Sequence, residues 1–256
     1  MFLEKNIIIF CFKDDIMKKN NALYISLAAL VVAVIALVMC IVCCSCKKGS
    51  DVEKVLKENP QIVMDALRAY EDQQREDALK QAEEKVKAHA DDLYNRADDG
   101  VIAHPDGKIV LVEFFDFSCG YCHRLYPALK EVIANNPDVK VVAKPMAFLS
   151  PTSKYAAQAA LAAKEQGKFA EVYTALFETQ GRLDNAKVDE IVASLGLDVE
   201  QLKKDMQSEK VKGTMNSVSE LASALQVTGV PTLILNNKVL QTLDASVIQE
   251  AINAAK

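Results

Sequence analysis

The sequence predicts an α/β domain with an all-helical insertion, preceded by a transmembrane helix and a long helical neck. A strand, a helix and a second strand follow one another within residues 108–143, which is the pattern of a βαβ unit. Alanine-rich helical patterns then fill about 151–226, and residues 22–44 form an uncharged apolar run. The expected parts are a cytoplasmic N-terminus at 1–21, a transmembrane signal anchor at 22–44, a neck at 51–99 and a folded domain at 101–256.

Composition and charge narrow the functional class. The chain has 256 residues, and half of them are apolar, which is enough for a sizeable core. Its 30 basic and 35 acidic residues are spread along the sequence and give a net charge of −5. The sequence has no basic stripe that could neutralise a phosphate backbone, so nucleic acid is not an expected partner.

The apolar run at 22–44 is long enough to cross a membrane. As a helix its 23 residues, at about 1.5 Å each, span a hydrocarbon layer of about 30 Å. The apolar core of a cleavable signal is shorter, at about 7–15 residues, so we favour an uncleaved anchor over cleavage or lipid attachment. Met17 is followed by Lys18 and Lys19, as at the start of an export signal, which predicts that translation starts at Met17.

A long helical neck is expected between the anchor and the folded domain. Asn59-Pro60 is a helix-start signal, because asparagine caps helices and proline suits the first helical position. Apolar residues recur at helical spacing from Val52 to Tyr70, and then every seven residues at Leu79, Val86 and Leu93. Either the helix lies against its own domain, or its apolar stripe pairs with another copy. We favour pairing, which predicts a homodimer or homotrimer.

The folded domain is expected to begin with a buried strand. Residues 108–117 read KIVLVEFFDF, a continuous run of β-branched and aromatic side chains. The segment RLYPALKEVIANN has the apolar spacing of a helix, and residues 138–143 give a second strand. The elements expected after the helical insertion are a strand at 228–235, a turn at Asn236-Asn237, a hairpin partner at 238–242 and a helix at 245–255.

The stretch CGYCH at 119–123 carries the chemistry. It fits a redox pair, a haem attachment site with His123 as ligand, or half of a zinc site. Haem is disfavoured because the predicted βαβ unit occupies its space, and zinc because no Cys or His follows residue 123. In the redox interpretation, the helix N-terminus stabilises a thiolate nucleophile at Cys119, and Cys122 resolves the mixed disulfide.

The distribution of cysteines is typical of an exported redox protein. Beyond residue 46 the chain carries a single i, i+3 cysteine pair and no stray thiol, as an oxidising compartment favours. The remaining cysteines all lie at or before residue 46, at Cys11, Cys40, Cys43, Cys44 and Cys46.

The stretches VEFFDFSCGYCH and TGVPT, with the helical insertion between them, resemble the DsbA family of thioredoxin-fold disulfide oxidoreductases over roughly residues 101–256. The resemblance implies a thioredoxin fold with Cys119 as nucleophile, Cys122 as resolving thiol and Pro231 as a cis-proline facing them. It also implies that the Val230 backbone holds an extended client protein. The other residues expected to bind the client are Thr228, Gly120, Tyr121 and His123.

The resemblance also implies a buried acid. Glu113 lies six residues before Cys119 and matches a glutamate that the family buries near its cysteines. By analogy Glu113 accepts the proton of Cys122, with help from Lys144. The alternative for Lys144 is an ordinary surface lysine.

Two features depart from the founding DsbA pattern, namely Gly120-Tyr121 between the cysteines and the helical neck. Both are similar to the ScsC-like branch, whose N-terminal segment drives oligomerisation and whose members can isomerise disulfides. We therefore expect a periplasmic enzyme, tethered to the inner membrane or secreted after cleavage, that forms or isomerises disulfides in exported proteins. A membrane redox partner is expected to recharge the Cys119–Cys122 disulfide, and no other cofactor and no metal is expected.

Two non-enzymatic alternatives stay open at this point. The two thiols could hold copper(I), a soft metal that favours thiolates. The neck and the helical insertion could instead serve a holding chaperone.

Overall fold

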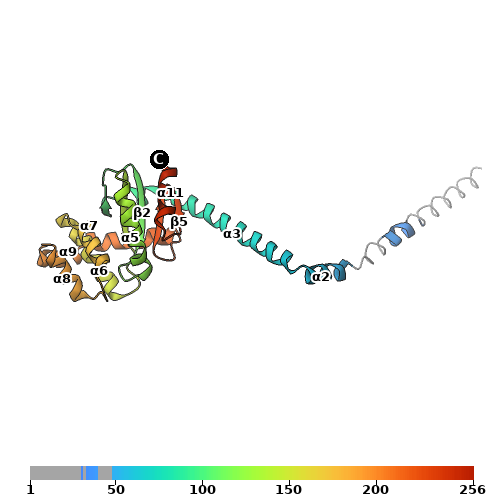
Figure 1. Cartoon of the computed structure of the whole chain (residues 1–256), viewed down its shortest axis with the longest axis horizontal. Helices are drawn as coiled ribbons and strands as arrows, with labels where there is room; N and C mark the ends of the chain where they lie inside the picture. The colour runs from blue at the N-terminus through green and yellow to red at the C-terminus, as the bar shows by residue number, and fades with distance from the viewer. Residues whose placement is uncertain (1–29, 31–32, 40–47) are drawn as a thin grey trace, which may run out of the picture. The chain divides into compact units, whose positions relative to one another are not determined.

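The computed structural model describes residues 30, 33–39 and 48–256 (Figure 1). The predicted N-terminus at 1–21, with Met17, and most of the predicted anchor at 22–44 lie outside the described residues. Among the helices that are described, none is both long and apolar enough to cross a membrane.

The chain divides into two compact units, Met1–Glu71 and Asp72–Lys256. The first contains α2 (Lys48–Glu58) and the beginning of α3 (Pro60–Ala88). α3 begins at Pro60, which confirms the predicted helix start. Asn59 separates the two helices, and its side-chain amide donates back to the carbonyl of Val55 in α2 at 3.1 Å. The large apolar side chains from Val52 to Tyr70, on α2 and the beginning of α3, are 38–62% exposed. We call them the neck stripe: Val52, Val55, Leu56, Ile62, Val63, Met64, Leu67 and Tyr70.

The second unit is built on a five-stranded sheet with the order β1-β3-β2-β4-β5. The neighbours β2 and β3 run parallel and are joined by α5, which confirms the predicted βαβ unit. The other pairs are antiparallel, and Asn236-Asn237 forms the predicted turn between β4 and β5 with φ values of 48° and 63°. The strands are β1 (Gly100–Ala103), β2 (Ile109–Phe115), β3 (Val139–Pro145), β4 (Thr232–Leu235) and β5 (Lys238–Leu240).

Helices between β3 and β4 form the predicted insertion (Figure 1). Serine or aspartate N-caps begin α6, α8, α9 and α10, and their side chains accept backbone N–H groups of the first turn. The helices of this unit beyond α3 are α4 (Ala90–Tyr94), α5 (Gly120–Asn135), α6 (Pro151–Ala163), the 3₁₀ turn η1 (Lys164–Gln166), α7 (Phe169–Glu178), α8 (Asn185–Ser194), α9 (Val199–Met206), α10 (Glu209–Ala224) and α11 (Ala245–Ala255).

The side chains of β2 alternate between two buried faces of the sheet. Leu111 packs with α5 and α11, and Phe115, on the same face, packs with α6 and α7 of the insertion. Val112 and Phe114 belong to a separate cluster on the other face, together with residues of α10. The sheet is therefore covered by helices on both sides, which explains the continuous apolar run in its central strand.

Part of the predicted neck belongs to the folded domain. Val86 in α3 and Leu93 in α4 are fully buried and share a cluster with Val112 and Phe114. Their seven-residue spacing therefore serves packing onto the sheet, the first of the two interpretations above. The compact unit begins at Asp72, so the predicted boundary near residue 100 is placed too late.

The sequence does not predict β1, because its few residues lie between two turn signals, DDG and PDG. β1 pairs with β3 along the edge of the sheet. Gly100 opens this strand, and the ring of Phe169 occupies the place where a Cβ at position 100 would lie. A glycine is therefore required for α7 to pack against the strand.

Candidate active site

Cys119 and Cys122 lie where β2 passes into α5. Cys119 is the N-cap of α5, and its Sγ accepts a hydrogen bond from the backbone N–H of Cys122 at 3.4 Å. Both residues are thiols in the structure, with 6% of Cys119 and none of Cys122 exposed. The N–H groups and dipole of the helix N-terminus favour negative charge on the sulfur of Cys119. Since Cys119 is the more accessible thiol, it is placed to meet a reaction partner first.

The loop before β4 closes the site from the other side. The Val230-Pro231 peptide is cis. The thiol of Cys119 donates to the carbonyl oxygen of Val230 at 3.4 Å, although the two residues are 111 positions apart in sequence. The structure thus brings the CGYC and TGVPT motifs together, as the sequence predicts.

A buried acid lies behind the cysteine pair. Glu113 on β2 is fully buried, and one carboxylate oxygen accepts a hydrogen bond from the Tyr173 hydroxyl at 2.5 Å. The other oxygen finds no partner among the described residues. Burial raises the pKa of Glu113 to about 7, although the hydrogen bond from Tyr173 lowers it.

The resolving thiol is held neutral in this environment. Burial raises the pKa of Cys122 far above its usual range, and the neighbouring Cys119 and Glu113 raise it further. Cys122 therefore needs a proton acceptor before it can act as a nucleophile. The charge of the Glu113 carboxylate raises the pKa of Cys122, and one oxygen of this carboxylate has no hydrogen-bond partner among the described residues. A pKa of about 7 suits a group that accepts and returns a proton near neutral pH.

The predicted help from Lys144 is wrong. Lys144 on β3 pairs in register with Phe114, so its side chain points to the face opposite that of Glu113. There its ammonium forms a buried ion pair with Asp99 and donates to the carbonyl of Asp92 at 3.0 Å. Burial lowers the pKa of Lys144 and raises the pKa of Asp99. Lys144 is consequently neither a surface lysine nor a neighbour of the acid behind the cysteines.

Tyr173 is a site residue that sequence reasoning missed. It packs edge-on against Phe115, with their ring centroids 5.2 Å apart, and at 4.7 Å from Phe177, so its surroundings are those of a core aromatic. Its hydroxyl nevertheless donates to Glu113. The pairing could have been sought on chemical grounds, because a buried tyrosine hydroxyl needs a hydrogen-bond acceptor and a buried glutamate needs a donor.

Asp116 is a second site residue that sequence reasoning missed. It is 1% exposed, and its Oδ1 accepts the backbone N–H of Ser118 at 2.8 Å. Its Oδ2 accepts the N–H groups of Phe148 and Leu149 at 3.0 Å and 3.1 Å. One carboxylate thus ties the loop before Cys119 to the loop before α6. The turn between Asp116 and Ser118 is the local pattern that aspartate favours.

Gly120 and His123 have different surroundings. A Cβ added at Gly120 would meet no atom within 4 Å, so the approach to Cys119 is open on that side. The ring nitrogens of His123 lie 2.9 Å and 3.2 Å from the carbonyl oxygens of Phe117 and Phe177. His123 therefore fastens α5 to the end of α7, which is a structural contact beside any role in binding a client.

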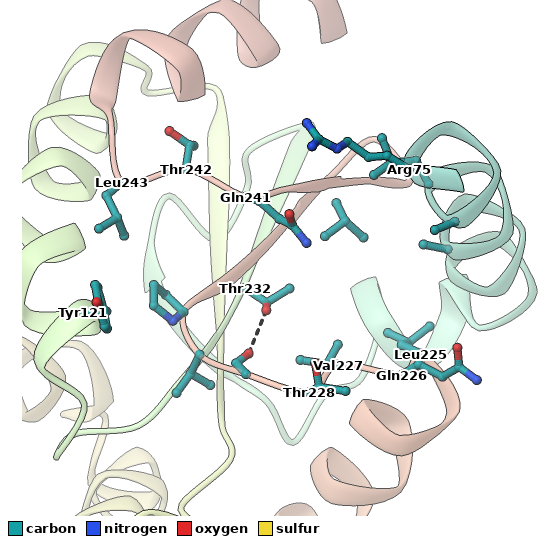
Figure 2. A pocket seen from close by; sticks show the side chains of 17 residues that line it. Arg75, Tyr121, Leu225, Gln226, Val227, Thr228, Thr232, Gln241, Thr242 and Leu243 are labelled. Atoms are coloured by element: carbon teal, nitrogen blue, oxygen red, sulfur yellow. Dashed lines mark hydrogen bonds between the residues drawn. The ribbon is translucent and has the colours of Figure 1, made fainter. Parts of the chain in front are cut away.

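A groove of about 580 Å³ opens beside the cis-proline loop (Figure 2). We call it the proline groove, and define it as the hollow lined by Tyr121, residues 225–232, residues 239 and 241–243, and the face of α3 from Arg75 to Ala82. The predicted client-binding residues Tyr121, Thr228 and Val230 all line it. Tyr121 is 60% exposed, so a large aromatic surface stands beside the reactive cysteine.

Residues 30, 33–39 and 48–256 contain no cluster of three or more His, Cys, Asp or Glu side chains that could hold a metal ion. Two neighbouring thiols such as Cys119 and Cys122 can together exchange two electrons when they form or break a disulfide.

The family model of the DSBA-like thioredoxin domain matches residues 110–253, which is more than half of the chain. The chain belongs to this family. Among solved structures, this DSBA-like chain is similar to a thioredoxin-like oxidoreductase from Silicibacter pomeroyi, with 32% identity and a TM-score of 0.62 over 64% of this chain and 96% of that chain. It is also similar to a linker-deletion mutant of Proteus mirabilis ScsC, with 27% identity and a TM-score of 0.65 over 77% and 93% of the two chains.

Curated relatives of this DSBA-like chain are similar to it over about half of its length. The thiol:disulfide interchange protein DsbA of Pseudomonas syringae is 30% identical over 138 residues, which are 52% of this chain and 64% of that protein. The Na(+)/H(+) antiporter NhaA 1 of Mycolicibacterium gilvum is 34% identical over 145 residues, or 55% of this chain. This chain spans only 24% of the antiporter's length, so the similarity concerns one part of that protein.

Replacing Glu113 with glutamine is expected to remove a pH-dependent loss of stability. The folded-state pKa of about 7 exceeds the ordinary value of 4.5, so the contribution of Glu113 to stability is fully present below pH 4.5 and is lost as the pH rises through 7. The loss is about 3 kcal/mol, at 1.36 kcal/mol per pKa unit. Glutamine stays neutral and can still accept the Tyr173 hydrogen bond. Urea unfolding of the reduced proteins below and above this window measures the difference.

Glu131→Gln is the matched control, because Glu131 is exposed on α5. It should keep the pH dependence of the wild type. If Glu113→Gln loses as much stability between pH 4.5 and 8 as the wild type does, the titrating group is not Glu113.

Proposed function

We propose that this DsbA-family chain forms and isomerises disulfide bonds in exported proteins through Cys119 and Cys122. The observation that carries the proposal is the contact between the Cys119 thiol and the Val230 carbonyl, at the N-terminus of α5. In this contact the more accessible of the two sulfurs lies beside a backbone edge that can hold an extended client. Glu113, which is held by the Tyr173 hydroxyl and whose charge acts on Cys122, supports thiol–disulfide exchange at this pair.

In the oxidising direction, a client thiolate attacks Cys119 Sγ of the Cys119–Cys122 disulfide. Cys122 leaves as a thiolate and takes up the proton of Glu113, since its high pKa favours the thiol. A second client thiolate then attacks the client sulfur of the mixed disulfide, and Cys119 leaves. The client loses two electrons and the enzyme gains them, so a redox partner must restore the disulfide.

In the isomerising direction, the reduced enzyme begins the cycle. The thiolate of Cys119 attacks a mispaired client disulfide and releases one client thiolate. A different client thiolate then displaces Cys119, which returns unchanged, so no net electron transfer takes place. If the client instead stalls, Cys122 gives its proton to Glu113 and attacks Cys119 Sγ of the mixed disulfide, and the client leaves as a thiolate. The client has then gained two electrons and the enzyme is left as the Cys119–Cys122 disulfide, which a dithiol reductant must reduce before the next cycle.

We further propose that the enzyme works in the periplasm, tethered to the inner membrane by residues 22–44 or secreted there after cleavage. The uncharged run of 23 residues and the single cysteine pair beyond residue 46 support this location. A membrane redox partner recharges the pair. The clients are exported proteins that contain cysteines.

The neck stripe supports a homodimer or homotrimer. Its apolar side chains are 38–62% exposed along α2 and the beginning of α3, and a second copy of the same stripe would cover them. Joining two or more active sites in one assembly raises the effective concentration of a second Cys119 for a client that is already bound. Such an arrangement suits isomerisation, in which several disulfides of one client must be exchanged.

The double variant Ile62→Asp with Leu67→Asp is expected to separate the copies. We expect the molar mass of the full chain in detergent to fall to that of a monomer. We also expect reactivation of scrambled ribonuclease to fall about tenfold, because the effective concentration is lost. Sedimentation and ribonuclease assays measure the two effects.

Gln74→Asp adds a comparable charge at an exposed polar position of α3 and should leave the mass and the ribonuclease assay unchanged. A monomeric wild type would refute the oligomer. A monomeric double variant with full isomerase activity would show that the neck acts only as a spacer.

A further inference from the structure

The proline groove has a wall that the thioredoxin-like core does not supply. On one side lie Tyr121, Val230 and Pro231, next to the reactive cysteine. On the other side lies α3, with Ala78, Leu79 and Ala82 facing the same hollow (Figure 2).

The contribution of α3 is held in place by two contacts with the domain. Val86, one turn beyond Ala82, is fully buried in the cluster beneath the sheet. Lys85 donates to the side chain of Gln226, which belongs to the loop that forms another side of the groove. The wall is therefore part of the folded unit that begins at Asp72.

The groove combines an apolar surface with one charge. Small and aliphatic side chains dominate its lining, and Arg75 is the charged residue among those that line it in the described part of the chain. Figure 2 shows Arg75 extending from α3 toward the side of the groove that carries Gln241. The small side chains of Ala78 and Ala82 leave room between the helix and the cis-proline loop.

We propose that α3 is a specificity wall for clients, which selects an extended segment with apolar residues next to its cysteine and an acidic residue beyond them. The inference rests on the proposed function, because the client is positioned by its exchange with Cys119. Continuity favours this occupant, since Tyr121, Val230 and Pro231 belong both to the groove and to the reaction site. Charge complementarity with Arg75 selects the carboxylate.

Two substitutions test the wall in the full chain. Arg75→Glu reverses the charge, and Ala78→Trp fills the hollow from an exposed position of the helix. The probes are reduced dodecapeptides with two cysteines, apolar flanks, and either glutamate or lysine placed two, four or six residues from the second cysteine. Oxidation of each peptide by the enzyme, with oxidised glutathione present to restore the Cys119–Cys122 disulfide after each turnover, is quenched with acid and followed by chromatography, and the rate without enzyme is subtracted.

We expect the wild type to have a KM about two- to fivefold lower for a glutamate peptide than for its lysine counterpart, the size of an exposed ion pair. Arg75→Glu should reverse this preference. Ala78→Trp should raise the KM for both peptides at least about tenfold, because a filled hollow excludes the apolar flank. Lys80→Glu and Ala88→Trp make the same changes at exposed positions of α3 outside the groove and should behave as the wild type.

The outcomes distinguish a failure of the proposed specificity of α3 from a failure of the proposed exchange function. If the wild type oxidises none of the peptides and does not react with oxidised glutathione when reduced, the proposed function fails. If exchange proceeds but Arg75→Glu and Ala78→Trp match their controls for every peptide, the wall is refuted. If Ala78→Trp changes the molar mass of the assembly and no KM, the groove is an interface between copies and the proposal is overturned.

Discussion

Replacing Cys119 with serine is expected to abolish oxidation and isomerisation of client disulfides, with a loss of at least about 10³-fold. A serine hydroxyl is not ionised near neutral pH and cannot form a mixed disulfide. The substitution is nearly isosteric, and the hydroxyl can still cap α5 and contact the Val230 carbonyl. The fold should therefore survive, and unchanged urea unfolding of the reduced protein checks this while peptide oxidation measures the activity.

Cys122→Ala is expected to fail in a different way. Cys119 keeps its place at the helix N-terminus and still attacks a client disulfide, but no second thiol remains to release the client. Mixed disulfides should accumulate with Cys122→Ala and not with Cys119→Ser. Equal residual exchange in both variants would mean that another cysteine of the chain carries the reaction.

Replacing Lys144 with methionine is expected to lower the free energy of unfolding by about 3–5 kcal/mol, the usual cost of breaking a buried ion pair. The side chains of Lys144 and Asp99 are 0% and 2% exposed, so Asp99 would be left as an uncompensated buried charge. One oxygen of Asp99 already lacks a hydrogen-bond partner among the described residues. Urea unfolding at neutral pH measures the change.

The double variant Asp99→Leu with Lys144→Met separates the charge from the packing. Removing both partners leaves no unpaired charge, so most of the lost stability should return. Lys130→Met is the control, because its ion pair with Glu178 is exposed and its loss should leave the free energy of unfolding nearly unchanged. A loss of less than 1 kcal/mol in Lys144→Met would show that Asp99 is protonated or reached by water in the folded protein.

The βαβ unit, the helical insertion and the final hairpin follow from local signals in the sequence. The apolar run before CGYC had to be a buried strand, and Asn236-Asn237 suits a turn whose residues both have positive φ. The contact between Cys119 and Val230 is not local, and it was predicted because two motifs together matched one family.

The partner of Lys144 could not be predicted in the same way. Strand side chains alternate between faces, so a shift of one residue in the pairing of β2 and β3 moves Lys144 from one side of the sheet to the other. Asp99 lies just before β1. The sequence does not predict this short strand, because it lies between two turn signals. Without that strand, the buried cation had no visible partner.

The seven-residue repeat at the end of the neck is compatible with two different structures. Leu79, Val86 and Leu93 recur every seven residues, which fits both a coiled coil and a helix packed on a domain. The structure buries Val86 and Leu93 against the sheet and leaves Leu79 in the proline groove. A truncation at residue 100 would therefore remove core residues, and this is why substitutions in the neck stripe are the better test of assembly.

The most direct test of exchange at Cys119 is to trap the client. The Cys122→Ala full chain is reduced, mixed with scrambled ribonuclease, quenched with an alkylating reagent and mapped by mass spectrometry without reduction. We expect a ribonuclease peptide joined by a disulfide to Cys119, and no such adduct with Cys119→Ser. The absence of any adduct, or an adduct confined to the cysteines between Cys11 and Cys46, would rule out exchange at Cys119.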